Sequence, residues 1–162
     1  MFGLTTLGII HTLISLVAVA TGAILLIRDK KITYGNQTGQ IYVIATIITC
    51  LTGFGIYQHG GFGKAHVLGI ITLIVLGIAW WAETRKNSFG KRTPYIEVVA
   101  YSMTFFFHLV PGVTETATRL PLDAPMASSP EDPNIQAAIG VCFLLFLIGS
   151  TWQVLKLKKS GN

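Results

Sequence analysis

The stretch FGLTTLGIIHTLISLVAVATGAILLI, residues 2–27, decides the fold class of this chain. It is apolar along its whole length, and His11 is its only ionisable side chain. An uninterrupted apolar run of this length is typical of a helix that crosses a bilayer. A cleaved signal peptide is not favoured, because no basic residue precedes the run and the run is longer than a typical signal core. We therefore expect an integral membrane protein.

Four further apolar segments follow, at residues 41–57, 66–82, 95–113 and 135–155, and Gly-, Asn- and Pro-containing connections separate them. Strands are not expected, because the segments do not alternate and an open sheet leaves unpaired backbone groups in lipid. Only 12% of the residues are charged, against about 25% in soluble domains. We predict an all-α, single transmembrane domain over residues 1–162, with five helices at about 2–27, 41–57, 66–82, 95–113 and 135–155.

The basic residues give the expected orientation. Ten of the twelve Lys and Arg side chains lie in the segments 28–31, 85–92 and 156–159, which five crossings place on one side. The other side holds Lys64 and Arg119. The positive-inside rule then predicts an N-terminus outside and a C-terminus in the cytoplasm of a bacterial inner membrane. The net charge of +5 is explained by this topology, so a nucleic-acid partner is not expected.

The spacing of His and Arg suggests a duplicated unit. His11 precedes Arg28 by 17 residues, and His66 precedes Arg85 by 19. Two parallel hairpin repeats followed by a fifth helix would produce this repeated spacing, and duplicated hairpins occur in membrane proteins.

All four histidines fall in the outer half of the expected bundle: His11, His59, His66 and His108. Ionisable residues within spans are costly and usually face the bundle interior. Neutral imidazole is the commonest metal ligand, so the four could form a cofactor site. A histidine can also simply bond to a neighbouring helix, and His59 could be exposed at the interface. Both readings stay open.

Three functional hypotheses follow. In the first, one b-type haem has His66 and His108 as its favoured axial pair, with His11 as the other candidate, and passes electrons to a periplasmic or quinone partner. In the second, His11, His59, His66 and His108, with Glu115, bind copper or zinc for metal handling or for a metal-dependent membrane hydrolase. In the third, the chain is a non-catalytic subunit, in a homo-oligomer or a larger assembly. A transporter is not favoured, because the spans lack paired carboxylates.

The outer connection after the fourth segment carries Glu115 and Arg119, at i and i+4 if this stretch is helical. They could form a structural ion pair. Alternatively, Glu115 could be a metal ligand, and Arg119 could bind a haem propionate or a phosphate. On the inner side, Glu97 is expected to pair with a basic residue of a connection.

The string Thr-Glu-Thr-Ala-Thr-Arg-Leu-Pro at residues 114–121, with Gly-Phe-Gly-Lys-Ala-His-Val-Leu-Gly-Ile at 61–70, resembles a family of small bacterial membrane proteins of unknown function. The resemblance covers nearly the whole chain and implies a shared multi-helix fold. The stretch Ala-His-Val-Leu-Gly-Ile-Ile-Thr at 65–72 is similar to one helix of the b561-type cytochromes. That similarity implies haem ligation by His66. Those proteins usually bind haems on both sides, whereas here only the outer half offers histidines.

Overall fold

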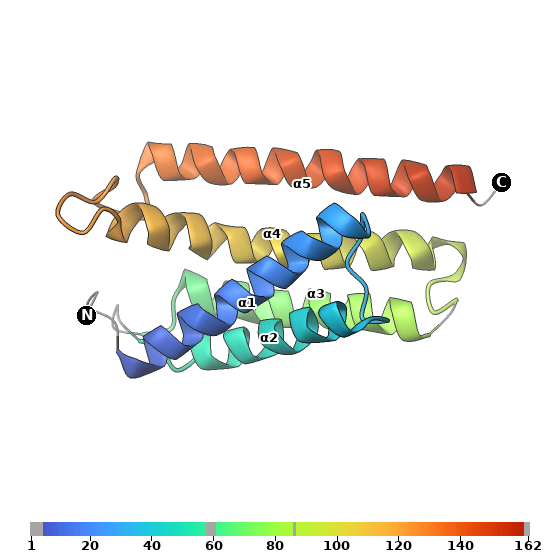
Figure 1. Ribbon diagram of the computed structural model, residues 1–162, viewed down its shortest axis with the longest axis horizontal. Helices are drawn as coiled ribbons and strands as arrows, with labels where there is room; N and C mark the ends of the chain where they lie inside the picture. Colours follow the sequence, from blue (N-terminus) through green and yellow to red (C-terminus); the bar gives the residue numbers. More distant parts are fainter. Residues whose placement is uncertain (1–4, 58–60, 86, 161–162) are drawn as a thin grey trace.

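The computed structural model describes residues 5–57, 61–85 and 87–160, and within them all regular structure is helical (Figure 1). This confirms the predicted all-α class. The helices are α1 (Thr6–Arg28), α2 (Gln37–Gly53), α3 (Lys64–Thr84), the short 3-10 helix η1 (Gly90–Arg92), α4 (Thr93–Arg119) and α5 (Pro133–Ser160).

Four helical stretches are long and apolar enough to cross a membrane: α1, α3, η1 with α4, and α5. The remaining helix, α2, has 17 residues. It begins earlier than its apolar segment, because the Asn36 side chain accepts a hydrogen bond from Gly39 N at 2.9 Å and so caps the helix there. The chain is thus compatible with a multi-pass membrane protein.

Helix α4 continues beyond residue 113, where the sequence predicts that the fourth helix ends. It passes through Pro111 and ends at Arg119, so the first part of the outer connection is helical. A proline removes only one backbone donor. The next turns are held by the hydroxyls of Thr114 and Thr118, which donate to Val110 O at 2.9 Å and Thr114 O at 2.8 Å.

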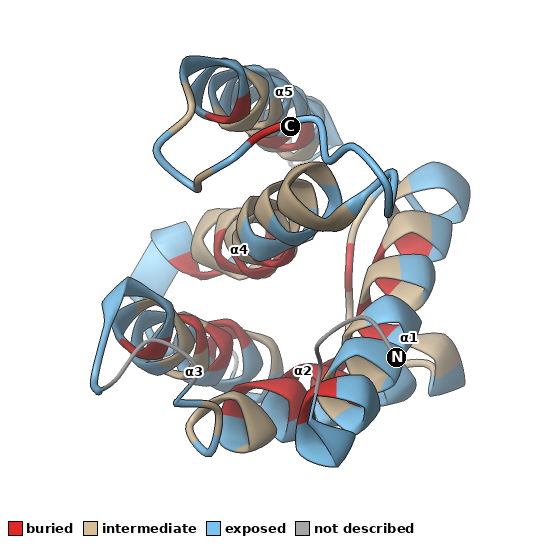
Figure 2. Ribbon diagram, turned by 90° about the vertical axis from the view of Figure 1, so that its left-hand side faces the viewer, coloured by how far each residue is buried: buried red, intermediate tan, exposed pale blue. Residues whose placement is uncertain are grey.

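The helices pack as neighbours in sequence. Helix α1 lies on α2, α3 on α4, and α5 contacts α4 but no other helix. Seen end-on, α1 to α4 surround the buried residues while α5 lies outside on α4 (Figure 2). We call the end where α1 begins and α4 ends the histidine end. The opposite end, where α1 ends and α4 begins, is the basic end.

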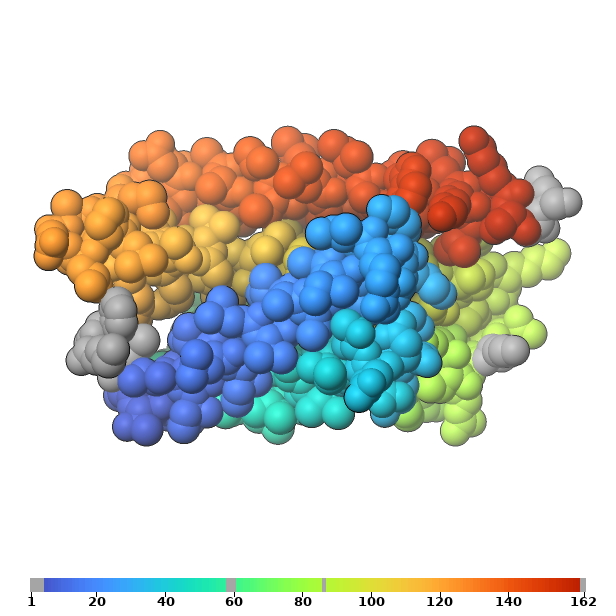
Figure 3. Space-filling model, in the orientation of Figure 1, coloured from blue at the N-terminus to red at the C-terminus, as the bar shows by residue number. Residues whose placement is uncertain are grey.

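The core between these helices is narrow. Tyr42, Tyr101, Leu25 and Ile32 are fully buried and pack together near the basic end. Helix α1 crosses diagonally from α2 towards α4, as the space-filling view shows (Figure 3). Gly22 permits this crossing, because a Cβ there would lie 2.6 Å from the ring of Phe105.

Large apolar side chains also cover the outside of the bundle. Leu13, Ile27 and Ile148 have exposed fractions of 60%, 72% and 67%. In water such a surface would favour aggregation, whereas lipid solvates it. The exterior therefore supports membrane insertion independently of helix length.

Hydrogen bonds and an ion pair connect the helices at the basic end. The Glu83 carboxylate on α3 accepts hydrogen bonds from Tyr34 N at 2.8 Å, Gly35 N at 3.0 Å, the Tyr101 hydroxyl at 2.7 Å and the Thr33 hydroxyl. It thereby joins the α1–α2 connection to α3 and α4. Lys31 in the same connection pairs with Glu97 at 3.3 Å, which confirms the expected partner of Glu97.

Helix α5 is attached by Gln153. Its side-chain oxygen accepts from the Ser102 hydroxyl at 2.9 Å, and its amide donates to Lys30 O at 2.9 Å. Gln153 is buried, as are Ile135 and Ser150, on a helix whose other described residues are partly or fully exposed. This residue therefore links α5 to both α4 and the α1–α2 connection.

Candidate functional site

His66 lies at the start of α3, surrounded by aromatic rings. The rings of Tyr57 and Phe62 each stack on the imidazole with centroids 5.2 Å away, and Phe54 lies at 6.5 Å. Gly69, one turn further on, leaves room for the Phe54 ring, since a Cβ there would lie 3.0 Å from it. Protein side chains thus fill the space beside this histidine.

The hydrogen bonds of His66 define its tautomer. Its Nδ1 accepts from Gly63 N at 3.1 Å, so the neutral ring carries its proton on Nε2. Nε2 is buried and has no hydrogen-bond partner within the described ranges. In this arrangement Nε2 presents a donor, whereas a metal needs a lone pair. Ligation through Nε2 would require the ring to change tautomer and give up the Gly63 bond.

His108 lies in the middle of the helix bundle. Its Nε2 is 3.0 Å from the Thr46 hydroxyl on α2, and its ring lies edge-on to Tyr42 with centroids 6.2 Å apart. The side chain is only 7% exposed. It therefore makes a buried bond between two helices whose Cα atoms stay more than 8 Å apart.

His11 is half-buried on α1 and approaches the same region. Its Nδ1 lies 3.1 Å from the Thr52 hydroxyl, and the Thr49 backbone is a second hydrogen-bond partner. It also interacts electrostatically with His108 and with Glu115. The buried hydroxyl of Thr49, close by on α2, has no hydrogen-bond partner in the described part of the chain.

The register of α3 and α4 separates His66 from His108. The Tyr101–Glu83 hydrogen bond aligns these two antiparallel helices. His108 is then level with Leu76, and His66 lies about ten residues further along α3, or roughly 15 Å. Ligands of one metal converge to within about 2 Å of it. His11 and His108 interact electrostatically, whereas His66 and His108 are too far apart to share one metal ion.

The remaining predicted ligands are dispersed. His59 lies outside the described residues. Glu115 forms an ion pair with Arg119 one turn along α4, so the structural alternative for these two is present. Within residues 5–57, 61–85 and 87–160, no three His, Cys, Asp or Glu side chains are grouped closely enough to hold a metal ion.

The feature that the structure adds is a column of polar side chains inside α1–α4. From His108 it continues through the Thr46 hydroxyl, which also hydrogen-bonds to the phenol of Tyr42. The Tyr42 hydroxyl is 2.7 Å from that of Thr104. Thr46, Tyr42 and Thr104 are completely buried. We call the set His11, His108, Thr46, Tyr42, Thr104, Tyr101 and Glu83 the polar column.

The column extends to the basic end through a second tyrosine. Tyr101 interacts electrostatically with Tyr42, and its hydroxyl donates to Glu83 at 2.7 Å. Towards the histidine end, His11 interacts with the exposed carboxylate of Glu115. Hydroxyl, imidazole and carboxylate groups therefore follow one another along most of the bundle. Its surroundings are apolar, because Leu25, Val43 and Leu76 pack beside it.

A sequence signal for this column exists but was missed. On α4 the residues Glu97, Tyr101, Thr104, His108 and Glu115 recur at spacings of three, four and seven, which puts them on one helix face. On α2, Tyr42, Thr46 and Thr49 do the same. The ionisable residues alone do not reveal this pattern, because hydroxyl groups stand between them on both helices.

Comparisons with known proteins leave the site to be interpreted from its own geometry. No family model, no curated protein and no solved structure matches this chain. The resemblances noted from the sequence therefore stay predictions.

Proposed function

We propose that this chain is a multi-pass protein of the bacterial inner membrane that conducts protons along the polar column. One observation carries the proposal, namely the buried succession His108, Thr46, Tyr42 and Thr104, in which side chains of α2 and α4 bond to one another. Polar chains inside membrane bundles are costly and commonly mark proton pathways.

The chemistry of these groups suits proton transfer. A hydroxyl donates one hydrogen bond and accepts others, and a neutral imidazole has one donor and one acceptor nitrogen. Thr46 and Thr104 donate their hydroxyl protons to the backbone carbonyls of Tyr42 and Tyr101, each at 2.8 Å. To pass a proton along the chain, each of these two hydroxyls would have to turn from its carbonyl towards its side-chain neighbour. Glu83 at one end and Glu115 with His11 at the other would exchange protons with the two aqueous sides.

The charge distribution supports an orientation for this pathway. The basic end carries nine of the eleven Lys and Arg residues that the structure describes, and by the positive-inside rule it lies in the cytoplasm. Trp80, Trp81 and Trp152 are exposed near the same end, where an aromatic belt is expected. Protons would then enter at His11 and leave at Glu83, or the reverse, with all five helices crossing the bilayer.

Proton flux into liposomes tests the proposal. Purified protein is reconstituted with an internal pH-sensitive dye, and a potassium gradient with valinomycin supplies the driving force. Tyr42→Phe removes one hydroxyl and keeps the ring, so the chain between Thr46 and Thr104 is broken. Loss of one hydrogen bond in the chain should raise the barrier to proton transfer by about 1.4 kcal/mol, which reduces the flux about tenfold. Tyr57→Phe, outside the column, is the matched control.

Two results would contradict proton conduction. One is wild-type flux no higher than that of protein-free liposomes. The other is an equal effect of Tyr42→Phe and Tyr57→Phe in proteins with equal thermal stability. Either result would leave the third hypothesis, in which the histidines and threonines only hold the helices together.

Haem b is retained as a second candidate, in a revised form with His11 and His108 as axial ligands, because these two interior histidines interact electrostatically. Both rings would have to exchange their threonine partners for iron. The visible spectrum of the purified protein, oxidised and then reduced with dithionite, tests this directly. A Soret band that is lost in His108→Ala and kept in His66→Ala would support it, and a colourless protein expressed with ample haem would refute it.

Copper or zinc would need a third donor beside His11 and His108, and Glu115 is the available carboxylate. Metal analysis of the purified wild type and of Glu115→Gln distinguishes this model from haem. Equal, near-zero metal content in both would exclude it.

A further inference from the structure

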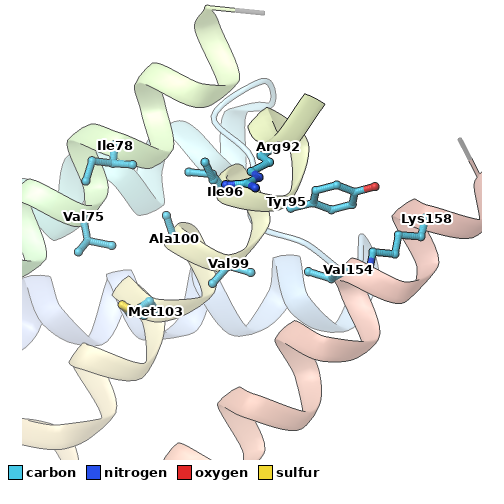
Figure 4. Close-up of a pocket in the computed structure, with 10 residues that line it drawn as sticks. All are labelled: Val75, Ile78, Arg92, Tyr95, Ile96, Val99, Ala100, Met103, Val154 and Lys158. Carbon is cyan, nitrogen blue, oxygen red and sulfur yellow. The ribbon is translucent and has the colours of Figure 1, made fainter. Parts of the chain in front are cut away.

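A groove of about 640 Å³ lies between α3, α4 and α5 near the basic end (Figure 4). It exists because α5 packs on α4 alone and leaves the space beside α3 open. Its walls are apolar, formed by Val75 and Ile78 on α3, Val99 and Met103 on α4, and Val154 on α5. In the close-up, Tyr95 points across towards α5 and Lys158.

Two cations flank one end of this groove. Arg92 precedes α4 and Lys158 lies on the last turns of α5, and both line it. Neither forms an ion pair within the described ranges, whereas Lys31 and Arg28 do. Among the described residues that line the groove, none is acidic. The groove thus has apolar walls and, at one end, two positive charges that come from different elements of the chain.

We propose that this groove binds one anionic phospholipid, with its phosphate between Arg92 and Lys158 and an acyl chain along Val99 and Met103. Basic pockets between membrane helices on the cytoplasmic side bind anionic headgroups. From Arg92 to Met103 the groove follows α4 for about eleven residues, or roughly 16 Å, which suits an acyl chain. A soluble phosphate would use the two cations and leave the apolar walls uncovered.

Native mass spectrometry tests the lipid and its position. The protein, purified in a neutral detergent, is mixed with equal amounts of phosphatidylglycerol and phosphatidylcholine. Wild type should retain phosphatidylglycerol preferentially. The double variant Arg92→Ala with Lys158→Ala should lower that retention about 30-fold, since each cation near an anionic surface contributes roughly a factor of five. The matched control is Lys91→Ala with Lys159→Ala, which removes equal charge beside the groove, and it should change retention less than about twofold.

A second variant tests the apolar part separately. Val99→Trp fills the groove and leaves both cations in place, so phosphatidylglycerol retention should fall while helix content by circular dichroism is unchanged. Glycerol 3-phosphate, which has the headgroup chemistry without acyl chains, should not compete.

Three outcomes would overturn the proposal. An equal loss in both double variants would indicate diffuse charge attraction. Full retention in Val99→Trp, or competition by glycerol 3-phosphate, would indicate binding of the phosphate alone. A dimer that Val99→Trp converts to a monomer, with no lipid retained by wild type, would make a second copy the occupant. None of these readouts depends on proton flux.

Discussion

At the scale of single residues, each described histidine has a neighbour that occupies one of its ring nitrogens. Thr52 bonds His11, the Gly63 backbone bonds His66, and Thr46 bonds His108. The reason is general, because a polar group removed from water must find a partner within the protein. An imidazole in a membrane helix is therefore a weak indication of a metal unless several converge.

His66→Phe should be tolerated, with a change in unfolding free energy within about 1 kcal/mol. The substitution keeps a flat ring between Tyr57 and Phe62 and removes a buried donor that has no acceptor in the described structure. It also removes the acceptor of Gly63 N, but Gly63 is exposed and water can replace that bond. His108→Phe removes the partner of Thr46 and should cost about 1–3 kcal/mol. Thermal unfolding in detergent compares the two. A larger loss for His66→Phe would mean that Nε2 has a ligand.

Gly22→Leu should destabilise the protein by about 1–3 kcal/mol, because its side chain would meet the rings of Phe105 and Tyr42. Gly77→Leu is the control, since no atom lies within 4 Å of the added Cβ. Both changes raise helix propensity equally, so the difference in melting temperature reports the crossing of α1. Similar melting temperatures would show that α1 does not approach α4 so closely.

At the scale of helices, side-chain bonds and packing shift the boundaries that apolar length suggests. An asparagine cap starts α2 at Gln37, and α4 continues through Pro111. Helix α5 is the least attached, because it contacts α4 alone and its buried polar link is Gln153. An outer helix of this kind depends on a few specific bonds, since lipid solvates its apolar surface as well as a neighbouring helix does.

Gln153→Leu should loosen α5. The Ser102 hydroxyl and the Lys30 carbonyl each lose a partner, and the expected cost is about 1–3 kcal/mol. Faster protease cleavage in the connection 121–132 measures this opening. Gln40→Leu, at an exposed position on α2, is the control and should leave the cleavage rate unchanged. Equal rates in all three proteins would show that apolar packing alone holds α5.

At the scale of the whole molecule, the bundle differs from a water-soluble one in its apolar surface and in the polar groups beside its apolar core. The outside is apolar over most of its length, and the interior carries a column of hydroxyl and imidazole groups. Helix α1 begins and helix α5 ends at opposite ends of the bundle (Figure 1). This arrangement agrees with an odd number of crossings, which the basic residues also favour.

Cysteine labelling tests the five crossings. In intact cells, a membrane-impermeant maleimide should label Phe62→Cys and Ser128→Cys, and should label Gln37→Cys only after the cells are opened. The positive-inside rule gives this pattern because Gln37 follows a basic connection.

The two native cysteines, Cys50 and Cys142, are replaced by alanine beforehand, so that each variant carries one thiol. Labelling of Gln37→Cys and Phe62→Cys from the same side would show that α2, the shortest of the five, does not cross.

Much of the fold follows from local sequence. The apolar runs predict all five helices, since a segment in lipid must satisfy its own backbone, and a helix does so with nearby residues. The charge bias predicts an orientation for the same reason, because it depends on each connection separately. The boundaries were less accurate at α2 and α4, where Asn36 and the threonines after Pro111 act locally but were not weighed.

The site was predicted less well, for a physical reason. The sequence identified His11 and His108 as interior groups, and in the structure these two interact electrostatically. It also paired His66 with His108, which the helix register separates. Thr46, the hydrogen-bond partner of His108, lies 62 residues away in the chain, and the two meet only through the packing of the helices. The apolar length of the segments thus determined that helices form, and the charge of the connections determined their expected orientation. Tertiary packing alone decided which polar side chains face one another.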